Sequence, residues 1–282
     1  MAQNFKISED SPLLVFLIAE LKDWPRKRVK KCLQMGSVLV NGNSTTQFDY
    51  ALKPGDSVEV RIEKTSKNKD DELEILFQDR YLIAINKPAG LLSVASADEN
   101  EPHALSLLRT QLSRPRKAVK LWPVHRLDRE TSGVLLFATS RELRESITAE
   151  WDSAEKTYMA IVEGCPEPLN GTINQPIRMD QNSYQATVGK HPAAKNAITH
   201  YKTEETVKGK SLLEVKIDTG RQHQIRAHLQ WLGHPVVGDR RYGTAGGRMG
   251  LHALRLDIMH VKTGKRIYFE TPAPDEFSAL LK

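Results

Sequence analysis

The stretch His125-Arg126-Leu127-Asp128-Arg129-Glu130-Thr131-Ser132-Gly133 is the most informative part of this chain. It concentrates ionisable side chains directly before an apolar run, residues 133–138, which we expect to form a buried strand. A dense polar loop packed against a buried strand is a common way to present a carboxylate at a cleft. The alternative is a surface loop whose charges pair with one another, and the residues by themselves favour neither interpretation.

A second polar stretch, Asp218-Thr219-Gly220-Arg221-Gln222-His223-Gln224-Ile225-Arg226, joins a predicted strand, residues 212–217, to a predicted helix, residues 222–232. Free N–H groups at the helix start, together with Arg221 and Arg226, suit a phosphate or a carboxylate. The alternative is an ordinary strand-to-helix turn with solvated arginines. Asp218-Thr219-Gly220 also spells the aspartic-protease triplet, but such proteases need two carboxylates that share a proton, and this chain has one such triplet.

Residues 1–62 are predicted to form a small α+β domain. Ser11 is the expected N-cap, and Pro12 the first residue, of a helix with an apolar stripe. A second helix is expected from residue 23 to Gly36, followed by strands at 38–40 and 58–62 with a turn at Asn41-Gly42. The second helix is basic, which predicts either RNA contact or a solvated helix face, and its cations are Arg26, Lys27, Arg28, Lys30 and Lys31.

The remaining chain is predicted to be a linker followed by a larger domain. Residues 63–72 contain no apolar side chain, which is typical of a linker. Beyond them the pattern predicts helices at 141–151 and 222–232, and strands at 73–77, 81–85, 133–138, 156–162, 198–201 and 212–217. Strands that do not alternate regularly with helices indicate an α+β domain, here residues 73–282, rather than a βαβ repeat.

Composition narrows the function classes. The chain has 41 Lys and Arg against 35 Asp and Glu, a surplus that suits a nucleic-acid partner without requiring one. Two cysteines, Cys32 and Cys165, predict neither a disulfide framework nor a zinc site and favour a reducing cytoplasm. No secretory signal or membrane span is predicted. The motifs of nucleotide hydrolases, dinucleotide-binding enzymes, serine hydrolases and His-Glu-x-x-His metal sites do not occur.

The ordered set of motifs resembles the RluA-type pseudouridine synthases. The stretch from His125 to Gly133 is similar to the signature of that family. The other motifs follow in the family's order: Asn86-Lys87-Pro88-Ala89-Gly90, Lys156-Thr157-Tyr158-Met159-Ala160, Thr219 to Arg226, Gly233-His234-Pro235-Val236-Val237-Gly238-Asp239 and Leu251-His252-Ala253.

This resemblance implies a catalytic domain with a mixed, mainly antiparallel β-sheet and an RNA-modifying isomerase that uses no cofactor and no metal. It implies that Asp128 is the catalytic carboxylate, that Arg221 forms a salt bridge with it, and that Tyr158 stacks on the flipped uracil. Contacts with the RNA substrate are expected from Lys87, His125, Arg126, Arg129, His223 and Arg226.

The N-terminal domain resembles the S4 RNA-binding domain in its basic helix, in Val40-Asn41-Gly42 and in Lys53-Pro54-Gly55-Asp56. An appended S4-like domain favours large-subunit ribosomal RNA of the 23S type as substrate, and we expect a cytoplasmic monomer. Two alternatives stay open: a transfer-RNA pseudouridine synthase, and a non-catalytic RNA-binding or ribosome-assembly factor. One departure from the family is Leu91-Leu92-Ser93-Val94-Ala95, where members often carry His-Pro, so contacts near the site are expected to differ.

Overall fold

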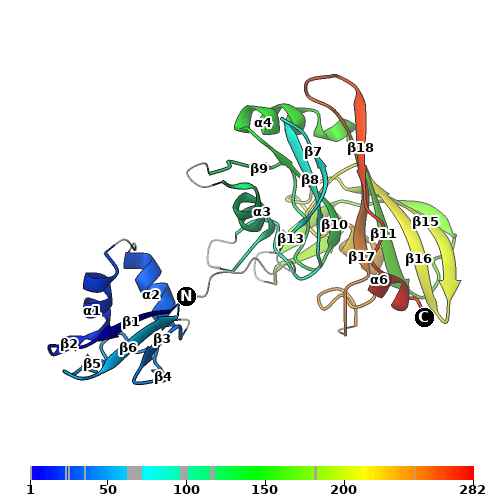
Figure 1. Cartoon of the computed structure of the whole chain (residues 1–282). Helices are drawn as coiled ribbons and strands as arrows, with labels where there is room; N and C mark the ends of the chain where they lie inside the picture. Colours follow the sequence, from blue (N-terminus) through cyan, green and yellow to red (C-terminus); the bar gives the residue numbers. More distant parts are fainter. Residues whose placement is uncertain are drawn as a thin grey trace. The chain divides into compact units, whose positions relative to one another are not determined.

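The computed structural model describes residues 2–22, 24, 26–34, 36–61, 72–95, 101–114, 118–180, 183–244 and 246–282. Internal contacts divide the chain into two units, Met1–Asp70 and Asp71–Lys282 (Figure 1). The predicted linker, residues 63–72, lies outside the described residues except for Glu72. Ile62, predicted as the end of a strand, lies outside them as well.

The N-terminal unit packs two helices against a four-stranded antiparallel sheet in the order β1-β6-β3-β4. Its core is built from the apolar positions of both helices and of the two central strands. Asn41 and Gly42 both have positive φ, 53° and 81°, which confirms the predicted turn. The elements are β1 (Ala2–Lys6), α1 (Leu13–Glu20), α2 (Arg26–Gln34), β3 (Val38–Val40), β4 (Asn43–Ser44) and β6 (Ser57–Arg61), with a small pair β2 (Ser11–Pro12) and β5 (Ala51–Leu52).

The predicted start of the first helix was wrong. Ser11 does not cap α1; it pairs with Leu52 in a short antiparallel strand, and Pro12 precedes the first helical residue. The free N–H groups of Leu13 and Leu14 donate instead to the carbonyl oxygens of Tyr50 and Phe48, at 2.9 and 3.0 Å. A distant segment therefore satisfies the helix start that a local serine was expected to satisfy.

The larger unit is built on one ten-stranded sheet, and the predicted α+β class is confirmed (Figure 1). Eight strands follow one another across it: β12 (Asn170–Asn174), β15 (Ile198–Val207), β16 (Lys210–Ile217), β11 (Glu155–Glu163), β17 (Leu251–Met259), β10 (Ser132–Ala138), β8 (Leu82–Lys87) and β7 (Glu74–Gln78). β18 (Arg266–Glu270) pairs with β17, β9 (Trp122–Pro123) pairs with β10, and β13 (Ile177–Asp180) pairs with β14 (Gln185–Val188) outside the sheet.

Helices cover both faces of this sheet, so its strands are apolar on both sides. Leu135 and Phe137 of β10 pack with α3 (Ala104–Leu112), whereas Val134 and Leu136 pack with α4 (Arg141–Ala149). In the same way, β11 alternates between a cluster with α5 (Gln224–Trp231) and a cluster with α6 (Asp275–Ala279). Tyr158 of β11 touches the clusters of both α3 and α5, so these two helices share one face. None of the described helices is long and apolar enough to cross a membrane.

The centre of the sheet contains a parallel pair, β10 beside β17, whereas the other recorded pairings among its described strands are antiparallel. Gly133 lies opposite Ala253 in this pair with φ of 111°, and a Cβ at Gly133 would stand 2.2 Å from the Ala253 carbonyl oxygen. Only glycine fits this approach. It sets the loop before β10 next to β11, because Ala253 also pairs with Tyr158.

Candidate active site

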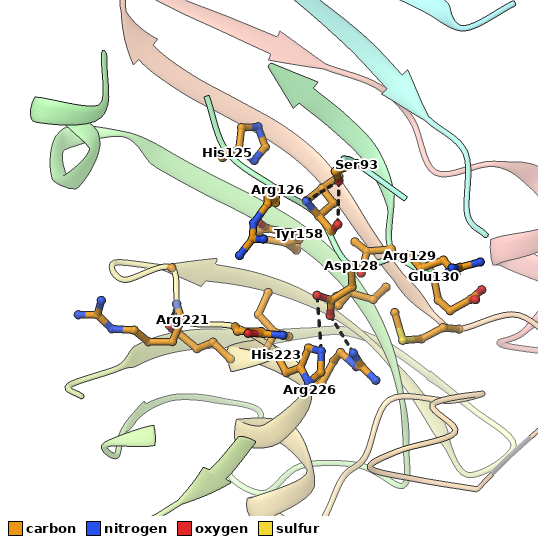
Figure 2. A pocket seen from close by; sticks show the side chains of 18 of the residues that line it. Ser93, His125, Arg126, Asp128, Arg129, Glu130, Tyr158, Arg221, His223 and Arg226 are labelled. Atoms are coloured by element: carbon orange, nitrogen blue, oxygen red, sulfur yellow. Dashed lines mark hydrogen bonds and ion pairs between the residues drawn. The ribbon is translucent and has the colours of Figure 1, made fainter. Parts of the chain in front are cut away.

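Asp128 lies in the loop between β9 and β10, on the face of the sheet that carries α3 and α5. The loop forms one wall of a cleft of about 860 Å³. Tyr158 of β11, His223 at the start of α5 and Arg226 within α5 also line this cleft. Figure 2 shows Asp128 directed toward His223 and Arg226. The fold therefore brings together residues from three predicted motifs.

The carboxylate of Asp128 is held by a buried guanidinium group. Arg226 Nη1 donates to Asp128 Oδ2 at 2.8 Å, and Arg226 Nε and Nη2 donate to the two oxygens of Asp239 at 2.6 and 2.8 Å. Arg226 is 7% exposed and Asp239 fully buried. Burial lowers the pKa of Arg226, but hydrogen bonds and charge from Asp239 and Asp128 outweigh it and raise that pKa above its ordinary value. Burial likewise opposes ionisation of Asp239, and the bonds from Arg226 keep its pKa below the usual range. Arg226 and Asp239 therefore stay charged.

The prediction that Arg221 forms this salt bridge was wrong. Arg221 is exposed, its Nε donates to the Asn196 carbonyl oxygen at 2.9 Å, and its side chain points away from Asp128 (Figure 2). It precedes the first residue of α5, whereas Arg226 lies inside the helix and faces the loop. Arg226 was expected to contact RNA, and that prediction was also wrong, because its side chain is buried between Asp128 and Asp239. A signal was present in the sequence: Arg226 stands between the apolar residues Ile225 and Ala227, where an arginine needs carboxylate partners.

Lys87, predicted to contact RNA, is fully buried, so that prediction was also wrong. Its Nζ donates to the carbonyl oxygens of Pro88, Leu91 and Arg129 at 2.9, 2.7 and 3.1 Å. These three acceptors account for the three protons of an ammonium group. Burial lowers the pKa of Lys87 to about 7, against the opposing charges of Asp128 and Glu130. Lys87 therefore ties the first motif to the Asp128 loop.

Ser93 also fixes this loop and was missed as a site residue. Its Oγ donates to the Leu127 carbonyl oxygen at 2.8 Å and accepts from the Leu127 N–H at 3.0 Å. On the other side of Asp128, the Gly90 N–H donates to the Arg129 carbonyl oxygen at 2.9 Å. Both neighbours of Asp128 are thus held by the segment that follows Lys87. The signal was a hydroxyl within an apolar run that, once buried, needs partners.

Tyr158 is the aromatic residue next to the carboxylate in the cleft. Burial raises the pKa of its hydroxyl, and the negative charge of Asp128 raises it further. The phenol therefore stays protonated at neutral pH.

His125 lines the cleft, but its ring is already engaged. It stacks on Trp151 with 5.3 Å between ring centroids, and its Nε2 accepts from the Leu136 N–H at 3.2 Å. Burial, aided by the charge of Lys156, lowers the pKa of His125 to about 4. The neutral ring accepts a hydrogen bond from the backbone of β10 and therefore supports this strand. Little of the side chain is left to contact RNA.

The other predicted RNA contacts lie in different surroundings. Arg126 is exposed and lies near Tyr158 at the cleft (Figure 2), whereas Arg129 pairs with Glu101 at 2.8 Å. Arg26 and Lys30 are exposed on α2. The side chains of the remaining α2 cations lie outside the described residues: Lys27, Arg28 and Lys31. Across the described ranges, no group of three or more His, Cys, Asp or Glu residues is placed to hold a metal ion.

Comparison with known proteins identifies the family. Residues 81–231 match the family described as RNA pseudouridylate synthase. The chain is 31% identical to an uncharacterized RNA pseudouridine synthase, YlyB, of Bacillus subtilis, over 95% of this chain and 92% of that one. It is also 31% identical to the ribosomal large subunit pseudouridine synthase D of Neisseria meningitidis, over 93% and 75% of the two chains.

A solved structure, human RNA pseudouridylate synthase domain containing 4, shares the fold with a TM-score of 0.62 and 24% identity, over 74% of this chain and 91% of that one. The family match covers the Asp128 loop, Tyr158 and Arg226, which the fold assembles in one cleft. The chain belongs to the RNA pseudouridylate synthase family and is an RNA pseudouridine synthase, an isomerase.

Proposed function

We propose that this enzyme converts specific uridines to pseudouridine in large-subunit ribosomal RNA of the 23S type, with Asp128 as its catalytic carboxylate and without a cofactor. The observation that carries the proposal is the carboxylate of Asp128, which Arg226 holds in the cleft that Tyr158 also lines. The ribosomal substrate is supported by the names of relatives from several bacteria, which are ribosomal large subunit pseudouridine synthases.

The reaction is a rearrangement that needs no outside reactant. The bond between N1 of uracil and C1′ of ribose breaks, the base turns, and a bond forms between C5 and C1′. C5 loses a proton, N1 gains one, and nothing is oxidised or reduced. The chemistry needs an ionised carboxylate at the ribose and an enclosed pocket that retains the detached base. Asp128 supplies the carboxylate, and the guanidinium of Arg226 donates to its Oδ2 and leaves Oδ1 available.

Tyr158 would stack on the uracil after the nucleotide leaves the RNA helix. Extrusion of a base costs a few kcal/mol, and an aromatic ring recovers part of that cost. The ring lies within the same cleft as Asp128, and its protonated hydroxyl can donate a hydrogen bond to an oxygen of the base.

Phosphate contacts would come from exposed cations around the cleft and on the S4-like domain. Arg126 and Arg221 are exposed and line the cleft, and Arg26 and Lys30 are exposed on α2. Release of counterions from the RNA would make these contacts strongly dependent on salt. We expect the enzyme to act on RNA as a cytoplasmic monomer.

The test is a transcriptome-wide map of pseudouridine in cells with and without the gene. Deletion is expected to remove one or more sites in large-subunit ribosomal RNA. A plasmid copy of the wild type should restore them, and a copy with Asp128→Asn should not. Loss of sites in transfer RNA alone would overturn the ribosomal assignment. An unchanged map, together with bound RNA, would indicate a non-catalytic RNA-binding factor.

A further inference from the structure

Asp128 has a second neighbour, His223, whose other ring nitrogen is tied to a tyrosine. His223 Nε2 lies 3.8 Å from Asp128 Oδ1, and His223 Nδ1 lies 3.0 Å from the hydroxyl oxygen of Tyr242. The same hydroxyl accepts a hydrogen bond from the backbone N–H of Ala186 in β14. A chain of polar groups thus runs from the β13–β14 hairpin to the carboxylate.

The chemistry of these groups favours one direction for this series of hydrogen bonds. A backbone N–H can only donate, so the Tyr242 oxygen is the acceptor from Ala186 and its own proton remains to be donated. The neighbouring acceptor is His223 Nδ1. A neutral imidazole whose Nδ1 accepts carries its proton on Nε2, the nitrogen that faces Asp128. At 3.8 Å this pair is longer than a hydrogen bond, and such contacts often shorten when substrate binds.

The surroundings of His223 hold the ring in its neutral form. Burial is the largest influence and lowers the pKa of His223. The positive charges of Arg226 on α5 and Arg241 on the following loop lower this pKa further. Asp128 and Asp239 oppose them without reversing the shift.

Tyr242 also touches the other partner of the carboxylate. The Arg226 guanidinium lies 5.0 Å from the centre of the Tyr242 ring, and the His223 ring meets it edge-on at 5.7 Å. The Tyr242 N–H donates to Asp239 Oδ1 at 3.2 Å. The ring of Tyr242 therefore contacts both Arg226 and His223, and its backbone N–H contacts Asp239.

We propose that Asp128 Oδ1 is the oxygen that reacts with the ribose, that the Nε2–H of His223 orients it, and that Tyr242 sets this tautomer as a positioning residue. The proposal rests on the proposed role of Asp128. Arg226 neutralises Oδ2, which leaves Oδ1 as the oxygen with the greater reactivity. His223 would then serve the carboxylate, in place of the RNA contact expected from the sequence.

Two substitutions of His223 separate its two nitrogens. The amide nitrogen of glutamine can reach the place of Nε2, whereas that of asparagine reaches only the place of Nδ1. His223→Gln is expected to keep kcat within about 10-fold of the wild type, and His223→Asn to lose about 100-fold, with little change in KM in either case. Equal loss in both variants, or no loss in either, would overturn the role of the Nε2–H.

Tyr242→Phe keeps the ring but removes the hydroxyl. Without a donor to Nδ1, part of the His223 population should carry its proton on Nδ1, so kcat should fall with little change in KM, and the pKa of His223 should rise because the neutral form loses a hydrogen bond. Tyr268→Phe, an exposed tyrosine on β18, is the control and should leave kcat unchanged. An unchanged kcat in Tyr242→Phe contradicts the proposal.

Nitrogen-15 spectra of the histidine side chains test the tautomer without RNA. The free wild-type enzyme should show His223 as the neutral Nε2–H form at pH 7, with the resonance assigned by its loss in His223→Gln. In Tyr242→Phe this resonance should titrate at higher pH. An Nδ1–H tautomer in the wild type would refute the proposal even if Asp128 is catalytic. A failure of the proposed role of Asp128 would instead appear as turnover retained in Asp128→Asn.

Discussion

Replacement of Arg226 by glutamine should damage both stability and activity. The guanidinium of Arg226 serves two carboxylates through three hydrogen bonds of 2.6 to 2.8 Å, and Asp239 is fully buried. Glutamine carries no charge, and its single amide group cannot donate to both carboxylates as the guanidinium group does. The variant therefore leaves a buried negative charge without its cation.

The expected loss of stability follows from this burial. Removal of one partner from a buried ion pair costs about 3–5 kcal/mol. Asp239 keeps hydrogen bonds from the backbone N–H groups of Arg241 and Tyr242, so we expect the lower end, about 3 kcal/mol. For a unit of this size that corresponds to a fall in Tm of about 6–12 °C. Asp128 also loses its fixed orientation, and a displacement of about 1 Å is enough to lower turnover about 100-fold.

Arg221→Gln is the matched control, because Arg221 is the neighbouring arginine of the same motif and is exposed. It should change stability by less than about 0.5 kcal/mol and affect mainly RNA affinity. Urea unfolding would give the stability of both variants, and release of tritium from RNA labelled at C5 of uridine would give their turnover. If Arg221→Gln is the more damaging variant, or if Arg226→Gln matches the wild type in both assays, the salt bridge has been assigned to the wrong arginine.

Three further predictions concern the residues that hold the loop. Gly133→Ala should cost more than about 2 kcal/mol, because of the positive φ and the 2.2 Å approach to Ala253, and an unchanged urea midpoint would argue against that close contact. Ser93→Ala leaves the N–H and C=O of Leu127 unpaired, so it should lower the free energy of unfolding by about 2 kcal/mol and lower kcat. Full turnover in this variant would show that the hydrogen bonds of Ser93 are not needed to position the Asp128 loop. In the folded protein His125 has a pKa of about 4, whereas in the unfolded chain its pKa is about 6.5. Below about pH 6.5 the unfolded chain therefore binds a proton that the folded protein does not. The free energy of unfolding should fall as the pH drops toward 4, by at most about 3 kcal/mol. His125→Phe keeps the stack on Trp151 and should flatten that fall, which unfolding at pH 7 and pH 4.5 would measure.

Elements with a regular pattern could be predicted from the sequence. The apolar run at 133–138 became β10, and the alternation at 212–217 became most of β16. β17 was not predicted as a strand, because polar residues occupy buried positions in it. His252 is buried between Ser132 and the Thr271 carbonyl oxygen, and Asp257 pairs with Arg255. Partners that are distant in the sequence, such as Ser132, permit such positions, and a local pattern does not contain them.

For the site as well, local motifs could be predicted from the sequence, whereas contacts between distant segments could not. The sequence pointed to Asp128 and Tyr158 through motifs, and the fold places both in one cleft. It did not show which arginine of the third motif meets the carboxylate, because that depends on how α5 packs against a loop 98 residues away. Lys87 was mistaken for a surface cation because its three acceptors are backbone carbonyls, which carry no signature in the sequence.

The most direct test of the central claim compares the wild type with Asp128→Asn on large-subunit ribosomal RNA labelled with tritium at C5 of uridine. Asparagine has nearly the same shape and can still accept a hydrogen bond from Arg226, so folding and RNA binding should persist. The wild type should release one tritium for each uridine converted, and Asp128→Asn should release none above background while it binds the RNA with similar affinity. Release by Asp128→Asn at a rate near that of the wild type would contradict the assignment of Asp128 as the catalytic carboxylate.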